Sequence, residues 1–164
     1  EVTKYMAKKA TKAADNIFYK ARMEAAACND NLNSREGAAE QLGIDRTRLA
    51  RIELGSLNPY PEEVLLMSDA YNTPELNNYF CSRMCPLRQQ TVPAAELLHL
   101  DRITIRILTA LGNTEFIQKT ILEIVKDGIV SEDEQPQVQQ ILKALENISK
   151  AAMEMKLWVE KNLR

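Results

Sequence analysis

The sequence predicts an all-helical protein, and three features of its composition indicate this. Five glycines and six prolines among 164 residues are few, since globular chains usually hold about 12% of the two together. Alanine and leucine dominate while aromatic residues make up only 5%, a balance that favours helices over sheets. Apolar residues account for 45% and charged residues for 27%, which is enough to build a packed core.

Several classes of protein are disfavoured by what the sequence lacks. There is no run of 18 apolar residues, and the N-terminus has no apolar signal-peptide core. One histidine and three cysteines leave little for metal or nucleophilic catalysis, and no phosphate-binding glycine loop or nucleophile elbow is present. We therefore expect a cytoplasmic protein with no membrane partner, no cofactor and no enzymatic activity.

Charge and proline content predict two domains. Residues 1–22 carry six basic and two acidic side chains, whereas the rest of the chain is net acidic. Any contact with phosphate must therefore come from local clusters, and the alternative for the N-terminal cluster is a solvated helix face. Two prolines bracket a polar stretch at residues 86–93, where a helix cannot continue. We expect a first domain over 1–85 with a basic N-terminal arm, a linker over 86–95 and a helical second domain over 96–164.

Capping signals divide the first domain into five short helices. Asp15 or Asn16 caps the first helix, which extends to about residue 27. The second and third helices are expected over 35–42 and 46–54, each preceded by a polar cap and followed by a glycine that closes the helix. The fourth helix begins at Pro61 and extends to residue 71, and the fifth follows Thr73-Pro74.

The second and third helices are separated only by Gly43-Ile44-Asp45. A turn this short sets two helices at about 90–120°, and Leu42, Ile44, Leu49 and Ile52 would form their shared core.

The third helix then exposes Arg46, Thr47, Arg48 and Arg51. Packing does not require arginines there, and positive charge is unfavourable at a helix N-terminus. These residues therefore predict an anionic partner.

Residues 34–55, SREGAAEQLGIDRTRLARIELG, resemble the lambda-repressor-like (Xre-type) helix-turn-helix family. The shared pattern is a small-residue cap, a mid-helix alanine, Leu-Gly and an apolar residue, then a second cap, an apolar residue, Ile-Glu, a variable residue and glycine. With the five expected helices, the resemblance covers about residues 15–85. It implies a sequence-specific regulator of transcription that binds double-stranded DNA and places the helix at 45–54 in the major groove.

The resemblance also implies a role for individual residues. Base-reading positions fall on Arg46, Thr47 and Arg51, a base or phosphate position on Arg48, and phosphate contacts on Ser34, Arg35 and Asn58. Arg35 stands where the family usually has glutamine, Ala38 where it has leucine, and Leu54 where it has asparagine. Glu53 matches a family glutamate that pairs with an arginine of the first helix, for which Arg22 is the only candidate.

Three further helices are expected in the second domain. Leu100, Ile103, Ile107 and Leu111 form a helical stripe, although Ile103, Ile105 and Ile107 also alternate as in a strand. We favour a helix because no partner strand is visible. A second helix begins near residue 114 and ends at Gly128. The third begins at a capping box of Ser131 and Glu134, or at Asp133 because of Pro136.

The last helix carries the most regular pattern in the chain. Its apolar positions alternate at spacings of three and four residues, as in a heptad seam: Val138, Ile141, Leu145, Ile148, Ala152, Met155 and Val159. The seam is either the buried face of an ordinary helical bundle or a helix that joins two subunits, and the two are compatible. We expect a homodimer formed through residues 97–164, with Leu142, Leu157 and Trp158 widening the patch.

Two alternatives remain open. Cys81 and Cys85 lie four residues apart, and with Cys28 and His99 they would supply the four ligands of a zinc site. The four are scattered, however, and cysteine is commonly a buried apolar residue, so we expect core cysteines and no metal. The alternative function is a protein–protein adaptor or antitoxin, in which the C-terminal helices bind another protein; a small effector is also an open possibility.

Overall fold

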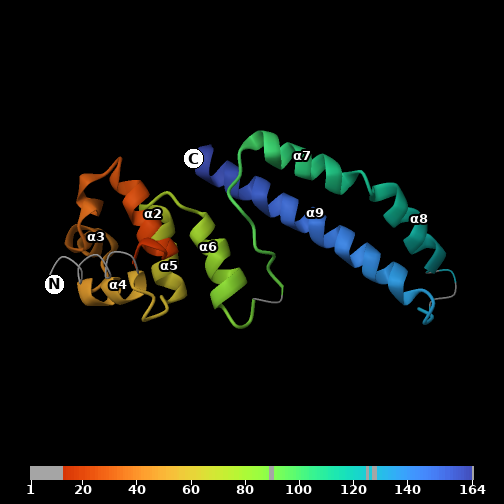
Figure 1. Ribbon diagram of the computed structural model, residues 1–164, viewed down its shortest axis with the longest axis horizontal. Coiled ribbons are helices and arrows are strands. Elements are labelled where there is room, and N and C mark those ends of the chain that lie inside the picture. Colours follow the sequence, from red (N-terminus) through yellow and green to blue (C-terminus); the bar gives the residue numbers. More distant parts are fainter. Residues whose placement is uncertain (1–12, 89–90, 125, 127–128, 164) are drawn as a thin grey trace, which may run out of the picture. The chain divides into compact units, whose positions relative to one another are not determined.

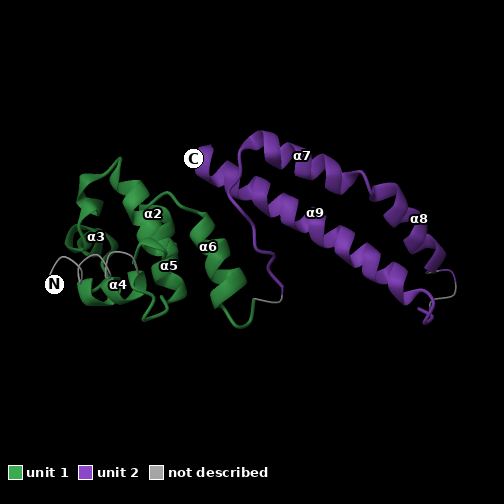
Figure 2. Ribbon diagram, in the orientation of Figure 1, with its two compact units in different colours: residues 1–89 green, residues 90–164 purple. Residues whose placement is uncertain are grey.

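The computed structural model describes residues 13–88, 91–124, 126 and 129–163. Throughout this described part the regular structure is helical, and it contains no strand. The chain divides into two compact units, residues 1–89 and 90–164 (Figure 2). The division falls within the expected linker, and each unit is described by itself.

Asn16 is the cap of helix α2 (Ile17–Ala26) in unit 1. Its Oδ1 accepts hydrogen bonds from the backbone N–H groups of Phe18 and Tyr19, at 2.8 and 3.3 Å. Its Nδ2 donates to the carbonyl of Ile52 at 3.0 Å. The cap thus also ties α2 to a distant segment. A short 3-10 turn, η1 (Asp30–Asn33), follows α2.

The two helices of the predicted helix-turn-helix are α3 (Arg35–Leu42) and α4 (Arg46–Glu53). Ser34 Oγ accepts the N–H of Gly37 at 3.0 Å, and Asp45 Oδ1 accepts the N–H of Arg48 at 2.9 Å. Gly43 closes α3 with a φ of 65°, a conformation that favours glycine. Both predicted caps and the predicted turn are therefore confirmed.

The other helices in the described part of unit 1 are α5 (Pro61–Ala70) and α6 (Glu75–Tyr79), and α2 to α6 gather into one unit (Figure 1). The fifth expected helix is α6, and after Tyr79 it widens into a π-helical turn, η2 (Phe80–Met84). There the N–H of Cys85 donates to the carbonyl of Phe80, five residues back, at 2.9 Å. The core includes the four residues expected to join the helix-turn-helix, namely Leu42, Ile44, Leu49 and Ile52.

Gly37 marks the closest approach of α3 to η1. A Cβ atom at this position would lie 2.3 Å from the carbonyl oxygen of Asn31, so backbone would have to move. We expect Gly37→Ala to destabilise unit 1 by about 1–3 kcal/mol, as overpacking does. Hydrogen exchange of amides in residues 13–88 measures this loss. Gly112→Ala is the control, because its added Cβ would come no closer than 3.4 Å to a neighbouring atom. We expect unchanged hydrogen exchange of the amides around residue 112 in that variant. Equal effects of the two changes would contradict the close approach of α3 to η1.

Unit 2 consists of α7 (Leu100–Leu111), α8 (Thr114–Ile124) and α9 (Gln135–Asn162). The first two follow one another along α9 and pack on it rather than on each other (Figure 1). Residues 103–107 therefore lie in a helix and not in a strand. Ile103 is fully buried, whereas Ile105, which would share its face in a strand, is 63% exposed. The unit is a single layer of helices, and no described helix in the chain is long and apolar enough to cross a membrane.

The predicted seam of α9 is divided between two surroundings. Ile141 is buried and Ile148 packs against the core, whereas Leu145 and Val159 are exposed. A heptad repeat drifts by about 20° per heptad around a straight helix, so the helices that pack along α9 do not cover the whole seam. Leu157, expected to widen an outer patch, is instead buried.

The N-terminus of α9 differs slightly from expectation. Its cap residue is Glu134 and the helix begins at Gln135. The N–H and the hydroxyl of Ser131 both donate to the Glu134 carboxylate at 2.8 Å. Ser131 therefore fixes the preceding turn and is not the cap of the helix.

Candidate nucleic-acid interface

The outer side of α4 presents three polar side chains. Arg46, Thr47 and Arg51 are all exposed, while Leu49 and Ile52 on the inner side are buried. Among the described residues, none forms a hydrogen bond or ion pair with the side chain of Arg46, Thr47 or Arg51. The structure thus brings together the three expected base-reading residues on one open surface.

Arg48 is placed differently from its three neighbours. Its Nε and Nη2 donate to the two carboxylate oxygens of Glu63, the second at 2.8 Å. Its guanidinium lies 4.0 Å from the centre of the Tyr60 ring, and the N–H of Tyr60 donates to Glu63 Oε2 at 2.7 Å. Arg48 thereby fastens α4 to the start of α5 and is less available to a partner than the sequence suggested.

The hydrogen bond from Arg48 lowers the pKa of the Glu63 carboxyl below its ordinary value, outweighing burial, which acts in the opposite direction. The same bond raises the pKa of Arg48. A carboxyl whose pKa is lower in the folded state stabilises the fold above its unfolded pKa, and this contribution is lost as the pH falls through the folded pKa.

We therefore expect Glu63→Gln to weaken unit 1 at neutral pH and to make its stability less sensitive to acid. Hydrogen exchange of residues 13–88, measured at several pH values between about 7 and 3, would show this. Glu62→Gln is the matched control, because Glu62 is exposed and forms no ion pair with any described residue. Parallel pH profiles for wild type and Glu63→Gln would contradict the role of this pair.

A second carboxylate, Glu53, holds α4 against α2 and α3. Arg22 Nε lies 2.5 Å from Glu53 Oε1, and Arg35 Nε lies 2.6 Å from Oε2. Arg22 also donates to the carbonyl of Leu32 at 2.6 Å. Burial by itself would lower the pKa of Arg22, but its hydrogen bond with Glu53 helps to raise it overall. The expected Arg22–Glu53 pair is confirmed, and Arg35 joins it.

The expected phosphate-contacting residues lie at the edges of this surface. Ser34 and Asn58 are exposed, and Ser34 also caps α3. Arg35 is one-third exposed; its Nε is taken by Glu53, while no described residue accepts from its two terminal nitrogens. Leu54, where the family has asparagine, is 41% exposed. Lys4, Lys8, Lys9 and Lys12 of the expected basic arm lie outside the described residues.

The described residues contain no group of three or more histidine, cysteine, aspartate or glutamate side chains that would hold a metal ion. Cys81 and Cys85 are half-buried, but Cys28 is exposed. The expectation of core cysteines is therefore wrong for Cys28, which follows the end of α2 where no element covers it. His99 is the cap residue of α7 in the other unit.

The residues that sequence reasoning missed are Glu63 and Tyr60, with the second role of Arg35. Their partners lie 12 to 18 residues away along the chain, and no local pattern links them.

Comparison of the chain with protein-family models, curated proteins and solved structures found no match.

Proposed function

We propose that the protein is a sequence-specific regulator of transcription of the lambda-repressor-like (Xre) class, which reads double-stranded DNA by placing α4 in the major groove. One observation carries the proposal. Arg46 and Arg51 are exposed and unpaired among the described residues, whereas the other arginines of α2, α3 and α4 bind the carboxylates of Glu53 or Glu63.

The chemistry of the three open side chains suits base recognition. An arginine fork donates two hydrogen bonds to O6 and N7 of guanine, and threonine contacts either a base edge or the methyl group of thymine. An α-helix with its side chains is about 10–12 Å in diameter, and the major groove is about 12 Å wide. A helix such as α4 (Arg46–Glu53) therefore fits into the groove.

The ion pairs give α4 a fixed position from which to read. Glu53 joins it to α2 and α3, and Arg48 joins it to α5. We therefore assign Arg48 mainly a positioning role. Ser34, Arg35 and Asn58 remain the proposed phosphate contacts, which fix orientation and carry no sequence information.

The proposal is tested by selection from a library of randomised duplexes with the full-length protein. Enrichment of one sequence motif over successive rounds is expected, together with a marked loss of affinity as the salt concentration rises. Binding of duplexes without enrichment of a motif, or no binding at low salt, would overturn the proposed function.

A protein–protein adaptor, such as an antitoxin, is the second candidate. The observation that favours it is the number of apolar side chains exposed on unit 2, among them Leu122 at 70% and Ile129 at 72%. A partner protein that stays bound in fixed stoichiometry through purification, without any selected DNA motif, would favour this function over the first.

A further inference from the structure

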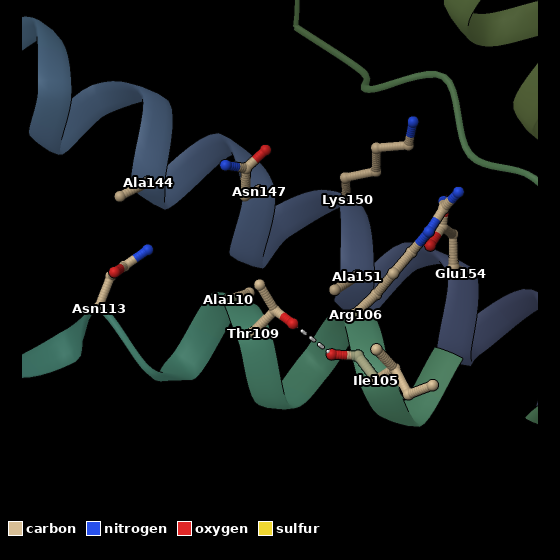
Figure 3. Close-up of a pocket in the computed structure, with 10 residues that line it drawn as sticks. All are labelled: Ile105, Arg106, Thr109, Ala110, Asn113, Ala144, Asn147, Lys150, Ala151 and Glu154. Atoms are coloured by element: carbon tan, nitrogen blue, oxygen red, sulfur yellow. Dashed lines mark hydrogen bonds and ion pairs between the residues drawn. The ribbon is translucent and has the colours of Figure 1, made fainter. Parts of the chain in front are cut away.

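A groove of about 350 Å³ lies between α7 and α9 in unit 2. Its volume is within the range of small-molecule sites, about 300–1,000 Å³. Figure 3 shows Arg106 and Glu154 at one end of the groove and Asn113 toward the other. Buried alanines line it between these ends, namely Ala110, Ala144 and Ala151. The groove thus has an apolar middle and polar ends, as sites for small polar molecules do.

Glu154 is fully buried, yet only one of its two carboxylate oxygens has a partner. Its Oε1 accepts a hydrogen bond from Arg106 Nη1, whereas no described residue donates to its Oε2. A buried acceptor without a donor is costly, and such groups are uncommon in folded proteins. Because Glu154 lines the groove, its unused oxygen favours a ligand that donates a hydrogen bond.

Arg106 controls access to this oxygen, which solvent does not reach. The Arg106 side chain is 42% exposed, and its Nη2 also lies 3.3 Å from Glu96 Oε2. Glu96 is exposed as well, so the guanidinium can turn toward Glu96 while a cationic group of the ligand takes its place beside Glu154. The donor that Glu154 favours is therefore a charged one, since charge-assisted hydrogen bonds are the stronger kind.

A second charge lies one helical turn before Glu154. Lys150 and Glu154 are four residues apart on α9, so their side chains are neighbours, and both line the groove. Among the described residues none forms an ion pair with the Lys150 ammonium, and the Glu154 carboxylate pairs with Arg106 instead. An unused acceptor next to an unused cation matches a zwitterion, whose ammonium and carboxylate are close together.

We propose that this groove binds a free α-amino acid with an uncharged polar side chain. The α-ammonium donates to Glu154 Oε2, and the α-carboxylate accepts from Lys150 Nζ. The side chain lies along the three alanines, and its polar end meets the amides of Asn113 and Asn147, which also line the groove.

The length of the groove fits this ligand. Asn147 precedes Glu154 by two helical turns, about 10 Å along α9. A side chain of about five heavy atoms, with a hydrogen bond of about 3 Å at each end, covers that distance. The three charged residues that line the groove lie toward its Glu154 end, so the Asn113 end favours an uncharged group. The proposed function concerns unit 1, and this site does not rest on it.

Methyl NMR of the full-length protein, labelled at alanine, tests the proposal with L-glutamine as the probe. We expect the methyl signals of Ala110, Ala144 and Ala151 to shift as glutamine is added, with a dissociation constant of about 0.1–10 mM for so small a ligand. The methyl of Ala38, buried in unit 1, should not shift. Two blocked forms are the matched control ligands, because N-acetyl-L-glutamine lacks the ammonium and L-glutaminamide lacks the carboxylate. Each is expected to bind at least about tenfold more weakly.

Two substitutions assign the charged contacts. Glu154→Gln is expected to raise the dissociation constant of glutamine at least about tenfold. Glu146→Gln, the same change at an exposed position of α9, should leave it unchanged. Lys150→Gln is expected to weaken the binding of glutamine but not of glutaminamide, which has already lost the contact with the lysine. Lys150 is half-buried, so this comparison stands even if circular dichroism shows that Glu154→Gln alters the fold.

No shift of the three alanine methyls at about 50 mM glutamine would overturn the proposal, and Glu154 Oε2 would then be served by water. Equal affinity for glutamine and its two blocked forms would also overturn it. So would a folded Glu154→Gln variant with an unchanged dissociation constant, or a Lys150→Gln variant that weakens glutamine and glutaminamide alike. DNA takes no part in these measurements, so this inference and the proposed function fail independently.

Discussion

Glu53→Ala is expected to lower the free energy of unfolding of unit 1 by about 3–5 kcal/mol, the usual cost of removing one partner from a buried ion pair. Glu53 is fully buried and Arg22 is 2% exposed. The substitution therefore leaves a guanidinium without its carboxylate in a place that water does not reach. Hydrogen exchange of amides in residues 13–88 measures the loss separately from unit 2. Glu40→Ala, at an exposed position of α3, is the control and should change stability little.

A double variant separates the lost charge pair from the lost packing. Replacing both members of a buried pair by apolar residues of similar volume is often neutral, so Arg22→Met combined with Glu53→Leu should be more stable than Glu53→Ala alone. Arg35 is a third exposed and is free to turn to solvent in this variant. If Glu53→Ala cost less than about 1 kcal/mol, the ion pairs would not be what holds α4 in place.

Arg46→Ala and Arg51→Ala are each expected to reduce discrimination between the selected operator and a scrambled duplex by about 1–3 kcal/mol. That is roughly a 5- to 150-fold loss of preference, because each arginine would donate a bidentate pair of hydrogen bonds to one guanine. Competition gel shifts with the two duplexes measure it. Arg102→Ala removes an exposed arginine of unit 2 and should leave the preference unchanged.

Arg46→Lys makes the test sharper. Lysine keeps the positive charge but lacks the planar fork. We expect this variant to bind scrambled DNA as wild type does and to lose part of its preference for the operator. An equal loss on both duplexes for Arg46→Ala would instead assign Arg46 to phosphate.

Most of the helix boundaries in unit 1 were predictable because their signals are local. Ser34 and Asp45 lie at most three residues from the N–H groups that they cap, and Gly43 adopts the left-handed conformation that its position after a helix indicates. The open positions of Arg46 and Arg51 follow from the same local periodicity, since Leu49 and Ile52 define the buried side of α4.

The features that were not predictable depend on contacts between distant parts of the chain. Nothing around Arg48 in the sequence indicates Glu63, fifteen residues away, so Arg48 looked as open as Arg46. The division of the α9 seam likewise depends on where α7 and α8 lie along it. The change to π-helical winding at Phe80 has no marker in the sequence, where Leu76, Phe80 and Met84 recur every four residues as in an ordinary α-helix.

The two arginines that pair with Glu53 also constrain which substitutions the chain can accept at these positions. Arg35 is partly exposed, so it can be exchanged for an uncharged residue while Glu53 keeps Arg22. Arg22 and Glu53 are buried together, and changing either alone passes through an intermediate with an isolated internal charge. Among proteins built in the same way, residues at positions 22 and 53 should therefore be inherited as a pair, whereas the buried charge places no such constraint on position 35.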